Sequence, residues 1–241
     1  GRIRGYEAFV RDITERREME HAIHEANRRL GLLESVTRHD LLNQLMKVQG
    51  FANLAACQVQ DPVIAGYLSK IDEAAASIAR QVEFMRSYHD LGAHSPTWVR
   101  VDEVVKRARY DEVTCCPSCQ GVEVHADPML EKVFSNLFEN AVEHGGHVIA
   151  ITVRCERHGD GLVVVVEDDG EGVPEGEKKA IFEKGHGHHT GLGLFLAREI
   201  LAITGITIRE NGIPGRGARF EIAVPERRFR PGPGGAGDPA P

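Results

Sequence analysis

Two heptad-spaced runs of small or apolar residues, separated by a short break, constrain the fold of this chain more than any other feature. The first run comprises Met19, Ile23, Ala26, Leu30, Leu33, Thr37, Leu41, Gln44, Val48, Ala52 and Ala55. The second comprises Ile64, Leu68, Ile71, Ala75, Ile78, Val82, Met85 and His89. Alternating steps of four and three residues place side chains on one face of a helix that packs against other helices. Each run therefore predicts one long helix.

The break between the runs, Gln60-Asp61-Pro62, predicts where the second helix begins. Asp61 suits an N-cap, and Pro62 suits the first helical position. Two long helices joined by a short turn must lie antiparallel. A lone hairpin with narrow apolar faces buries little surface, so we expect it to pair with a second copy in a four-helix bundle, as a homodimer. A structural coiled-coil spacer would show the same periodicity.

The residues after the second run predict a linker at 91–96 and a separate domain from Thr97. Strands are expected at Trp98–Val101, Val122–His125, Val148–Val153, Leu162–Val166, Ile206–Glu210 and Ala218–Val224, and helices from Asp102, from Asp127 to His144 and from Leu192 to Ile203. The predicted fold class is α+β, a helical hairpin followed by an α/β sandwich with helices over one face of a sheet. Arg230 to Pro241 is rich in Pro, Gly and Ala and is expected to be disordered.

Composition narrows the classes of partner. The 241 residues suffice for two modest domains, and the net charge of -7, from 29 basic and 36 acidic side chains, offers no basic face for nucleic acid or anionic lipid. No run of about eighteen apolar residues and no secretion signal is found. Five cysteines favour reduced thiols over a disulfide framework. We therefore expect a cytoplasmic protein without nucleic-acid partners or direct membrane contact in this fragment.

A possible phosphate acceptor lies on the first predicted helix. His39 and Asn43 stack on one helix face, with Asp40 beside them, and His39 falls off the heptad face toward solvent. A carboxylate there can accept the proton of one ring nitrogen and leave the other nitrogen free to attack phosphorus. An exposed histidine on a polar helix face is the alternative interpretation of this short motif.

Three segments of the second domain contain residue types that bind nucleotides. Asn136 and Asn140 lie four residues apart, a spacing that suits magnesium and phosphate oxygens. Asp168 follows an apolar strand and precedes Gly170 and Gly172, which would allow a ligand close to the backbone. The third segment, 185–194, is a glycine-rich loop leading into a helix start, where free amides bind phosphate. Each segment alone also fits an ordinary helix surface or loop.

Taken in order, these motifs resemble those of bacterial and archaeal sensor histidine kinases. His39-Asp40 resembles the phosphoacceptor box, Asn136 to Asn140 the asparagine box, Asp168-x-Gly170-x-Gly172 the first glycine box, Ile181-Phe182-Glu183 the phenylalanine box, Thr190-Gly191-Leu192-Gly193-Leu194 the second glycine box and Gly215-Arg216-Gly217 the third. Phe9 to Arg16 resembles the end of a sensory PAS domain, which suggests a fragment of a longer receptor. The expected organisation is a PAS remnant at 1–14, a dimerisation and phosphotransfer hairpin at 15–92, an ATP-binding domain at 97–226 and a disordered tail at 227–241.

The resemblance implies a role for each matching residue. Asp168 would bind the adenine amino group above Gly170 and Gly172. Asn140, with Asn136, would hold Mg²⁺ at the triphosphate of ATP. The remaining nucleotide contacts would come from Lys184, Thr190, Gly191, Leu192, Gly193 and Leu194. His39 would attack the γ-phosphorus with Asp40 as base, and the phosphoryl group would pass to an aspartate on a response regulator receiver domain. Asn43 is a hypothesis for orienting water in a regulator phosphatase reaction.

Two features depart from the family pattern. Glu143 stands where many relatives carry a lysine, so the corresponding phosphate contact would come from Lys184 or from His186, His188 and His189, or be missing. Those three histidines with His144 invite a zinc interpretation, but no second ligand group accompanies them. The three are therefore expected to belong to a flexible lid over ATP, which the resemblance places at Lys184 to Thr190. Cys115, Cys116 and Cys119 are interpreted as a reduced surface loop, with metal binding or a redox role as alternatives and Cys57 and Cys155 taken as isolated.

Two other functional classes compete with a kinase. An ATP-binding scaffold without kinase activity would be expected to lose one of His39, Asp40 or the two asparagines. An ATP-gated clamp, as in chaperones and mismatch-repair proteins, lacks a phosphoacceptor hairpin before its ATP domain, so residues 15–90 tell against it.

Overall fold

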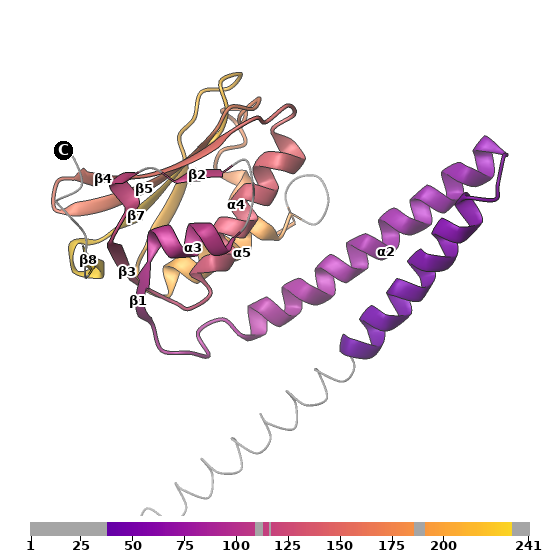
Figure 1. Ribbon diagram of the computed structural model, residues 1–241, viewed down its shortest axis with the longest axis horizontal. Coiled ribbons are helices and arrows are strands. Elements are labelled where there is room, and N and C mark those ends of the chain that lie inside the picture. Colours follow the sequence, from indigo (N-terminus) through magenta and orange to yellow (C-terminus); the bar gives the residue numbers. More distant parts are fainter. Residues whose placement is uncertain (1–37, 109–112, 116, 186–190, 233–241) are drawn as a thin grey trace, which may run out of the picture. The chain divides into compact units, whose positions relative to one another are not determined.

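The computed structural model describes residues 38–108, 113–115, 117–185 and 191–232, in two compact units, Gly1–Ala79 and Arg80–Pro241 (Figure 1). The possible PAS remnant, the first part of the first heptad run and Thr190 lie outside the described residues. In the part of the chain that is described, no helix combines the length and the apolar character needed to span a membrane.

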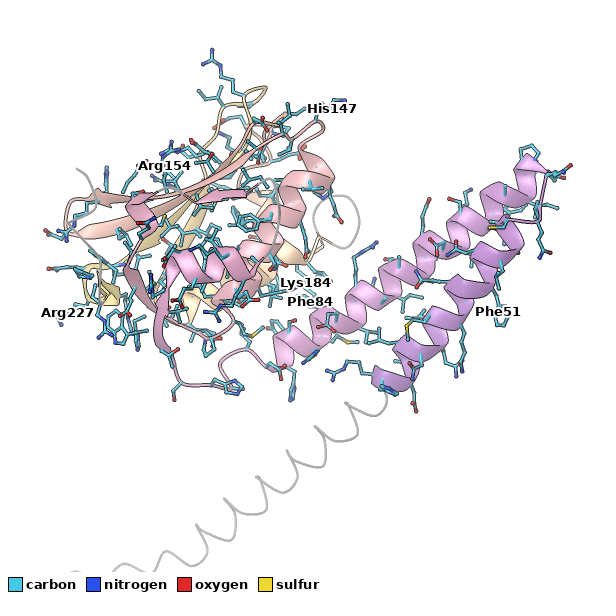
Figure 2. The ribbon with its side chains drawn as sticks, in the orientation of Figure 1. Phe51, Phe84, His147, Arg154, Lys184 and Arg227 are labelled. Carbon is cyan, nitrogen blue, oxygen red and sulfur yellow. The ribbon has the colours of Figure 1, made fainter. Side chains whose placement is uncertain are left out.

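The first unit contains two helices separated by a chain reversal. Residues 38–56 are helical, and α2 (Pro62–His89) begins at the predicted proline. The Asp61 carboxylate accepts a hydrogen bond of 2.8 Å from the amide of Val63, as an N-cap does. Ala52 and Ala75 are buried. Phe51, by contrast, is 72% exposed and points away from α2 (Figure 2), so much apolar surface of these helices is open to solvent.

The second unit is built on two sheets. A three-stranded sheet has the order β1-β3-β8, and a five-stranded sheet has the order β2-β4-β5-β7-β6, antiparallel except for the β2–β4 pair. The strands are β1 (Thr97–Arg100), β2 (Val113–Cys115), β3 (Val122–Ala126), β4 (Ile151–His158), β5 (Gly161–Asp168), β6 (Thr207–Glu210), β7 (Arg219–Val224) and β8 (Phe229–Pro231). Six of these eight strands overlap the strands predicted from the sequence.

The unit also contains the end of α2 from Arg80 and three further helices, α3 (Val101–Arg107), α4 (Leu130–His144) and α5 (Gly193–Ala202). Three single turns are η1 (Pro117–Cys119), η2 (Ala180–Phe182) and η3 (Glu226–Arg228). The core contains Phe134, Leu137 and Phe138 of α4, all at most 1% exposed. On β4, Ile151, Val153 and Cys155 are buried while the residues between them are half-buried, so one face of the strand contributes to this core. Burial of one sheet face under helices gives the two layers expected of an α+β domain.

The end of the described chain differs from the sequence expectation. Residues from 227 were predicted to be disordered, but β8 pairs antiparallel with β3. Arg230 donates a hydrogen bond of 2.6 Å to Glu123 and lies 4.2 Å from the centre of the Trp98 ring. The strand was missed because its stability comes from an ion pair and a cation–π contact with distant residues rather than from apolar alternation.

Candidate functional site

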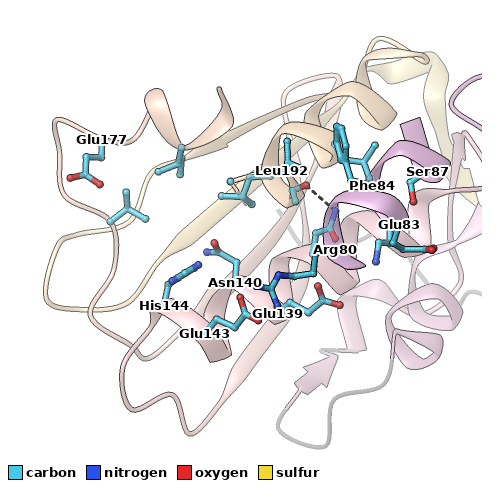
Figure 3. Close-up of a pocket in the computed structure, with 18 of the residues that line it drawn as sticks. Arg80, Glu83, Phe84, Ser87, Glu139, Asn140, Glu143, His144, Glu177 and Leu192 are labelled. Atoms are coloured by element: carbon cyan, nitrogen blue, oxygen red, sulfur yellow. Dashed lines mark hydrogen bonds between the residues drawn. The ribbon is translucent and has the colours of Figure 1, made fainter. Parts of the chain in front are cut away.

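A cavity of about 470 Å³ lies in the second unit beside α4 (Figure 3). Its walls come from α4, the loop after β5, the start of α5 and the last turns of α2. The lining residues include Arg80, Lys132, Asn136, Glu139, Asn140, Glu143, His144, Glu171, Gly172, Glu177, Gly191, Leu192, Gly193 and Leu194. The mixture of charged, amide and apolar groups suits a ligand with both apolar and polar parts.

One row of α4 supplies much of the polar lining. Lys132, Asn136, Asn140 and His144 follow one another at intervals of four residues, which places them along one helix face. Figure 3 shows Asn140, Glu143 and His144 together on this side of the cavity. The asparagine spacing read from the sequence therefore brings both predicted residues into one cavity.

Asn136 joins α4 to the start of α5. It is 5% exposed, and its side-chain nitrogen donates a hydrogen bond of 2.8 Å to the carbonyl of Gly193. A Cβ on Gly193 would lie 3.6 Å from Asn136, an ordinary packing distance. The amide group of Asn136 thus fixes the helix start, and its oxygen is the acceptor it retains for a ligand.

The start of α5 presents backbone amides to the cavity. Gly191 adopts φ = 58°, and Leu192, Gly193 and Leu194 follow it along the cavity wall. The first amides of a helix have no intrahelical partner and carry partial positive charge, so they favour phosphate. The hydrogen bond from Asn136 to the carbonyl of Gly193 keeps this helix start in place.

Asp168 ends β5 in a rigid hydrogen-bonded setting. Its Oδ1 accepts bonds of 3.0 Å from the amides of both Gly170 and Ala218. Burial raises the pKa of Asp168, and these two bonds oppose that rise. Both bonds use Oδ1, so Oδ2 is the oxygen suited to accept a hydrogen bond from a ligand.

Close backbone contacts explain the glycines around Asp168. Gly172 has φ = 71°, and a Cβ there would lie 2.7 Å from the carbonyl oxygen of Gly217. Gly217 itself has φ = 101°, and its Cβ would collide with the Asp168 carbonyl oxygen. A side chain at either position would force these segments apart. The first and third glycine motifs are therefore packed directly against each other.

An ion pair between a partly exposed lysine and a buried glutamate supports the same loops. Lys178 donates a hydrogen bond of 2.6 Å to the carbonyl of Gly212, and its ammonium lies 3.5 Å from Glu210, whose side chain is 0% exposed. The Glu210 carboxylate accepts bonds from the amides of Gly212 and Arg219. A hydrogen bond with Glu175 and the charge of Glu210 raise the pKa of Lys178. This network links the chain after Gly172 to the β6–β7 connection.

The predicted phosphoacceptor lies in the first unit. His39 and Asp40 are 75% and 73% exposed, and Nδ1 of His39 lies 3.5 Å from Asp40 Oδ1. The Asn43 side-chain nitrogen lies 3.1 Å from the same Nδ1 and 3.4 Å from Nε2. The three side chains predicted to act together are therefore adjacent on one helix and accessible.

Some of the residues predicted to contact the nucleotide line the cavity, and others do not. Those lining the cavity are Asn136, Asn140, Gly172, Gly191, Leu192, Gly193 and Leu194, whereas Asp168, Gly170 and Lys184 are not among its lining residues. Lys132 was not predicted from the sequence, although its position four residues before Asn136 places it on the same helix face. The described residues contain no cluster of three or more His, Cys, Asp or Glu side chains arranged for a metal. The three lid histidines proposed as zinc alternatives lie outside the described residues.

One family model matches the segment that contains α4 and the start of α5. Residues 126–228 match the profile described as histidine kinase-, DNA gyrase B-, and HSP90-like ATPase. This span begins just before α4 and ends in η3, so it contains both asparagines, Asp168 and the start of α5.

Curated relatives share parts of the chain. It is 38% identical over 104 residues to the alginate biosynthesis sensor protein KinB of Pseudomonas aeruginosa, which covers 40% of this chain and 17% of KinB. It is 28% identical over 245 residues to the signal transduction histidine-protein kinase AtoS of Escherichia coli strain K12, an alignment that covers 93% of this chain and 40% of AtoS. It is 31% identical over 217 residues to the sensor histidine kinase ZraS of Klebsiella oxytoca, an alignment that covers 81% of this chain and 46% of ZraS. The chain spans less than half the length of each.

Two solved structures share the fold. Full-length ShkA, in complex with AMPPNP, matches with a TM-score of 0.57 at 20% identity, over 80% of this chain and 45% of that one. The Acinetobacter baumannii histidine kinase AdeS matches with a TM-score of 0.51 at 17% identity, over 78% of this chain and 98% of that one.

Proposed function

We propose that this chain is the catalytic core of a sensor histidine kinase, which transfers the γ-phosphoryl group of ATP to His39 and then to an aspartate of a response regulator. The observation that carries this proposal is the α4 cavity: both asparagines lie in its wall, and both belong to the span that matches the ATPase family. Two of the named relatives, AtoS and ZraS, are histidine kinases, and KinB is a sensor protein, which supports the same activity.

The adenine end of ATP would bind near Asp168. An ionised carboxylate accepts a hydrogen bond from an exocyclic amino group, and the two amides on Oδ1 hold this carboxylate in one orientation. The contact of Gly172 with Gly217 keeps the adjoining backbone close, which leaves a flat surface for the base. A nucleotide placed here would extend along α4 toward Asn140.

The triphosphate end would bind between α4 and the start of α5. Amides at Gly191 and Gly193 would donate to phosphate oxygens. The carboxamide oxygens of Asn140 and Asn136 fit Mg²⁺, which prefers oxygen ligands and retains several waters. Bound there, Mg²⁺ would neutralise phosphate charge. Lys132, from the same helix row, supplies the positive charge that Glu143 does not.

His39 would be the nucleophile. An Nδ1–H bonded to Asp40 would leave the Nε2 lone pair for in-line attack on the γ-phosphorus, and the Asp40 carboxylate would stabilise the charge that develops on the ring. Exposure of His39 allows a catalytic domain, and later a receiver domain, to reach it. Asn43 touches the same ring, so it would also be placed to orient water for dephosphorylating the regulator.

A second copy of the chain would complete the helical unit. Leu41, Ile64 and Ile71 belong to the heptad faces, yet each remains at least 45% exposed in the single chain. Pairing with another hairpin would bury these faces in a four-helix bundle. We therefore include homodimerisation in the proposed function.

The first test is autophosphorylation of the chain with γ-labelled ATP and Mg²⁺, compared with His39→Gln. The expected result is an acid-labile label in the wild type that is absent from the variant, with nucleotide binding preserved in both. Retention of label in His39→Gln would refute the assignment of the acceptor. Binding of ATP without any label in the wild type would favour the ATP-binding scaffold instead.

A further inference from the structure

Two cysteines distant in the sequence meet in the core of the second unit. Cys119 ends η1 and is 0% exposed, and Cys155 on β4 is 2% exposed. Their sulfur atoms lie 2.9 Å apart, and both residues are thiols. The interpretation of Cys155 as isolated was therefore wrong, because β4 brings it against a turn 36 residues earlier in the chain. The placement of Cys119 in a surface loop was also wrong, because η1 packs that side chain into the core.

The surrounding contacts fix η1 against β4 and so keep the two sulfur atoms close together. The Cys155 amide donates a hydrogen bond of 3.1 Å to the Ser118 hydroxyl, and Cys119 Sγ lies 3.6 Å from the carbonyl of Val153. Just before η1, β2 runs parallel to β4 and pairs Cys115 with Val153. The turn is thus attached to β4 by backbone and side-chain bonds on either side of the sulfur contact.

We propose that Cys119 and Cys155 form an oxidation site that closes to an intramolecular disulfide when hydrogen peroxide enters the domain. A disulfide requires a sulfur separation of about 2.05 Å, so less than about 1 Å of further approach is needed. Peroxide is the oxidant because its size is close to that of water, whereas the near-complete burial of both thiols excludes larger disulfide reagents.

The reaction balances with peroxide alone. One thiol loses its proton and the thiolate attacks a peroxide oxygen; the O–O bond breaks, and the departing hydroxide takes up that proton, so a sulfenic acid and water result. The second thiol then attacks that sulfur, so the S–S bond forms, the S–O bond breaks and a second water leaves. Two thiols and one H₂O₂ thus give one disulfide and two waters, with peroxide oxygen reduced and sulfur oxidised.

The cross-link would close a loop that carries part of the proposed nucleotide site. Between the two cysteines lie β3 and all of α4, including Asn136 and Asn140. Neither cysteine lines the cavity. We therefore expect oxidation to stabilise the domain, raising its Tm by on the order of 10 °C, while ATP affinity changes by less than about twofold. The proposal does not depend on kinase activity.

Peptide mapping of the full chain tests the bond directly. After treatment with H₂O₂ and alkylation of remaining thiols in denaturant, trypsin should yield peptide Tyr110–Lys132 linked to peptide Cys155–Arg157. Dithiothreitol should separate them. A disulfide confined within Tyr110–Lys132, or alkylated Cys155 after peroxide treatment, would overturn the proposal.

Variants identify the partner and the effect on stability. In Cys119→Ala the Cys155–Arg157 peptide should remain unlinked, and in Cys155→Ala the Tm should no longer rise with peroxide. Cys57→Ala, which removes an exposed thiol in the other unit, should keep both the linked peptides and the rise in Tm. Because the mapping uses the wild-type protein, it decides the question even if a core variant is unstable. Linkage that survives in Cys119→Ala would assign the bond to another cysteine.

Discussion

Asp168 is partly buried and is proposed to accept a hydrogen bond from adenine, so its protonation should change the affinity for ATP. Burial raises its pKa above the ordinary value of 3.8. If adenine binding needs the ionised carboxylate, ATP affinity should fall as the pH is lowered through this raised pKa, at a higher pH than for an ordinary aspartate. Asp168→Asn should reduce affinity for ATP about 10- to 100-fold at neutral pH, by removing a charge-assisted hydrogen bond.

Calorimetric titration with ATP from neutral to acidic pH checks both parts. The acid-dependent loss of affinity should be present in the wild type and absent from Asp168→Asn. Titration with GTP is the specificity control, because a guanine base does not present the amino group at the same position. Equal ATP affinities for the two proteins would remove Asp168 from the site.

Lys132 is the lysine that lines the cavity and could replace the missing family lysine. Lys132→Met should weaken ATP binding about tenfold and adenosine binding hardly at all, because a single charge-assisted contact to phosphate is lost. Lys106→Met is a matched control, since Lys106 is an exposed lysine on α3 outside the cavity lining. Equilibrium binding of both ligands to both variants makes the comparison. Equal weakening for adenosine and ATP would indicate a structural role for Lys132.

Residues close in sequence were predictable as site partners, and distant ones were not. Asn136 and Asn140 share a helix face by spacing alone, and His39, Asp40 and Asn43 do so for the same reason. The contact between Cys119 and Cys155 depends on which strand lies beside η1. The carbonyl of Gly193, bonded to Asn136, likewise belongs to another helix. Such pairs follow from tertiary packing, which no local pattern encodes.

At the scale of the elements, a ladder of charges crosses the face of the five-stranded sheet opposite the helices. Arg154 on β4 and Arg219 on β7 both donate to Glu167 on β5, and Arg219 also donates to Glu221. The register places Val165 between Arg154 and Glu221, and Val165 is 0% exposed. The long charged side chains therefore cover an apolar residue on the outer face.

Glu167→Gln should lower the free energy of unfolding by about 1–2 kcal/mol at neutral pH, after discounting for partial solvent exposure. Burial raises the pKa of Glu167, but the hydrogen bonds from Arg154 and Arg219 outweigh it and hold the pKa below the ordinary 4.5. The ionised form thus stabilises the fold fully above pH 4.5, and this contribution is lost as pH falls through the lower folded-state pKa.

Urea unfolding across this pH range measures the effect. The difference between wild type and Glu167→Gln should shrink as the pH falls below 4.5, while Glu226→Gln, an exposed change in η3, should differ little from wild type throughout. A pH-independent difference would mean that Glu167 acts through packing rather than charge.

Periodicity identified the long elements better than the short ones. The strands β4, β5 and β7 were recognised because buried residues recur along six to eight positions. The three-residue strands β2 and β8 are too short to show a period, and β8 was placed in a disordered tail. Their existence depends on pairing with β4 and β3. Short edge strands are specified by their neighbours rather than by their own sequence.

At the scale of the whole molecule, the heptad faces predicted from the sequence remain partly exposed to solvent in the structure of the single chain. The heptad faces predicted two helices, and described residues 38–56 and α2 are helical. Ile71 and Ile78 nevertheless remain 45% and 47% exposed. An isoleucine that is buried rather than exposed stabilises by about 1.5–3 kcal/mol, so these exposed isoleucines on the heptad row favour association.

Ile71→Lys should therefore weaken dimerisation at least tenfold, because each dimer would bury two lysines in place of two isoleucines. Sedimentation equilibrium over a range of concentrations would show a shift toward monomer. Val63→Lys is the matched control: Val63 is 61% exposed on the same helix but outside the heptad row, so its dimer should persist. If both variants dissociate equally, general charge repulsion rather than the heptad face is responsible. If neither does, the exposed face serves another contact, and the proposed four-helix bundle is wrong.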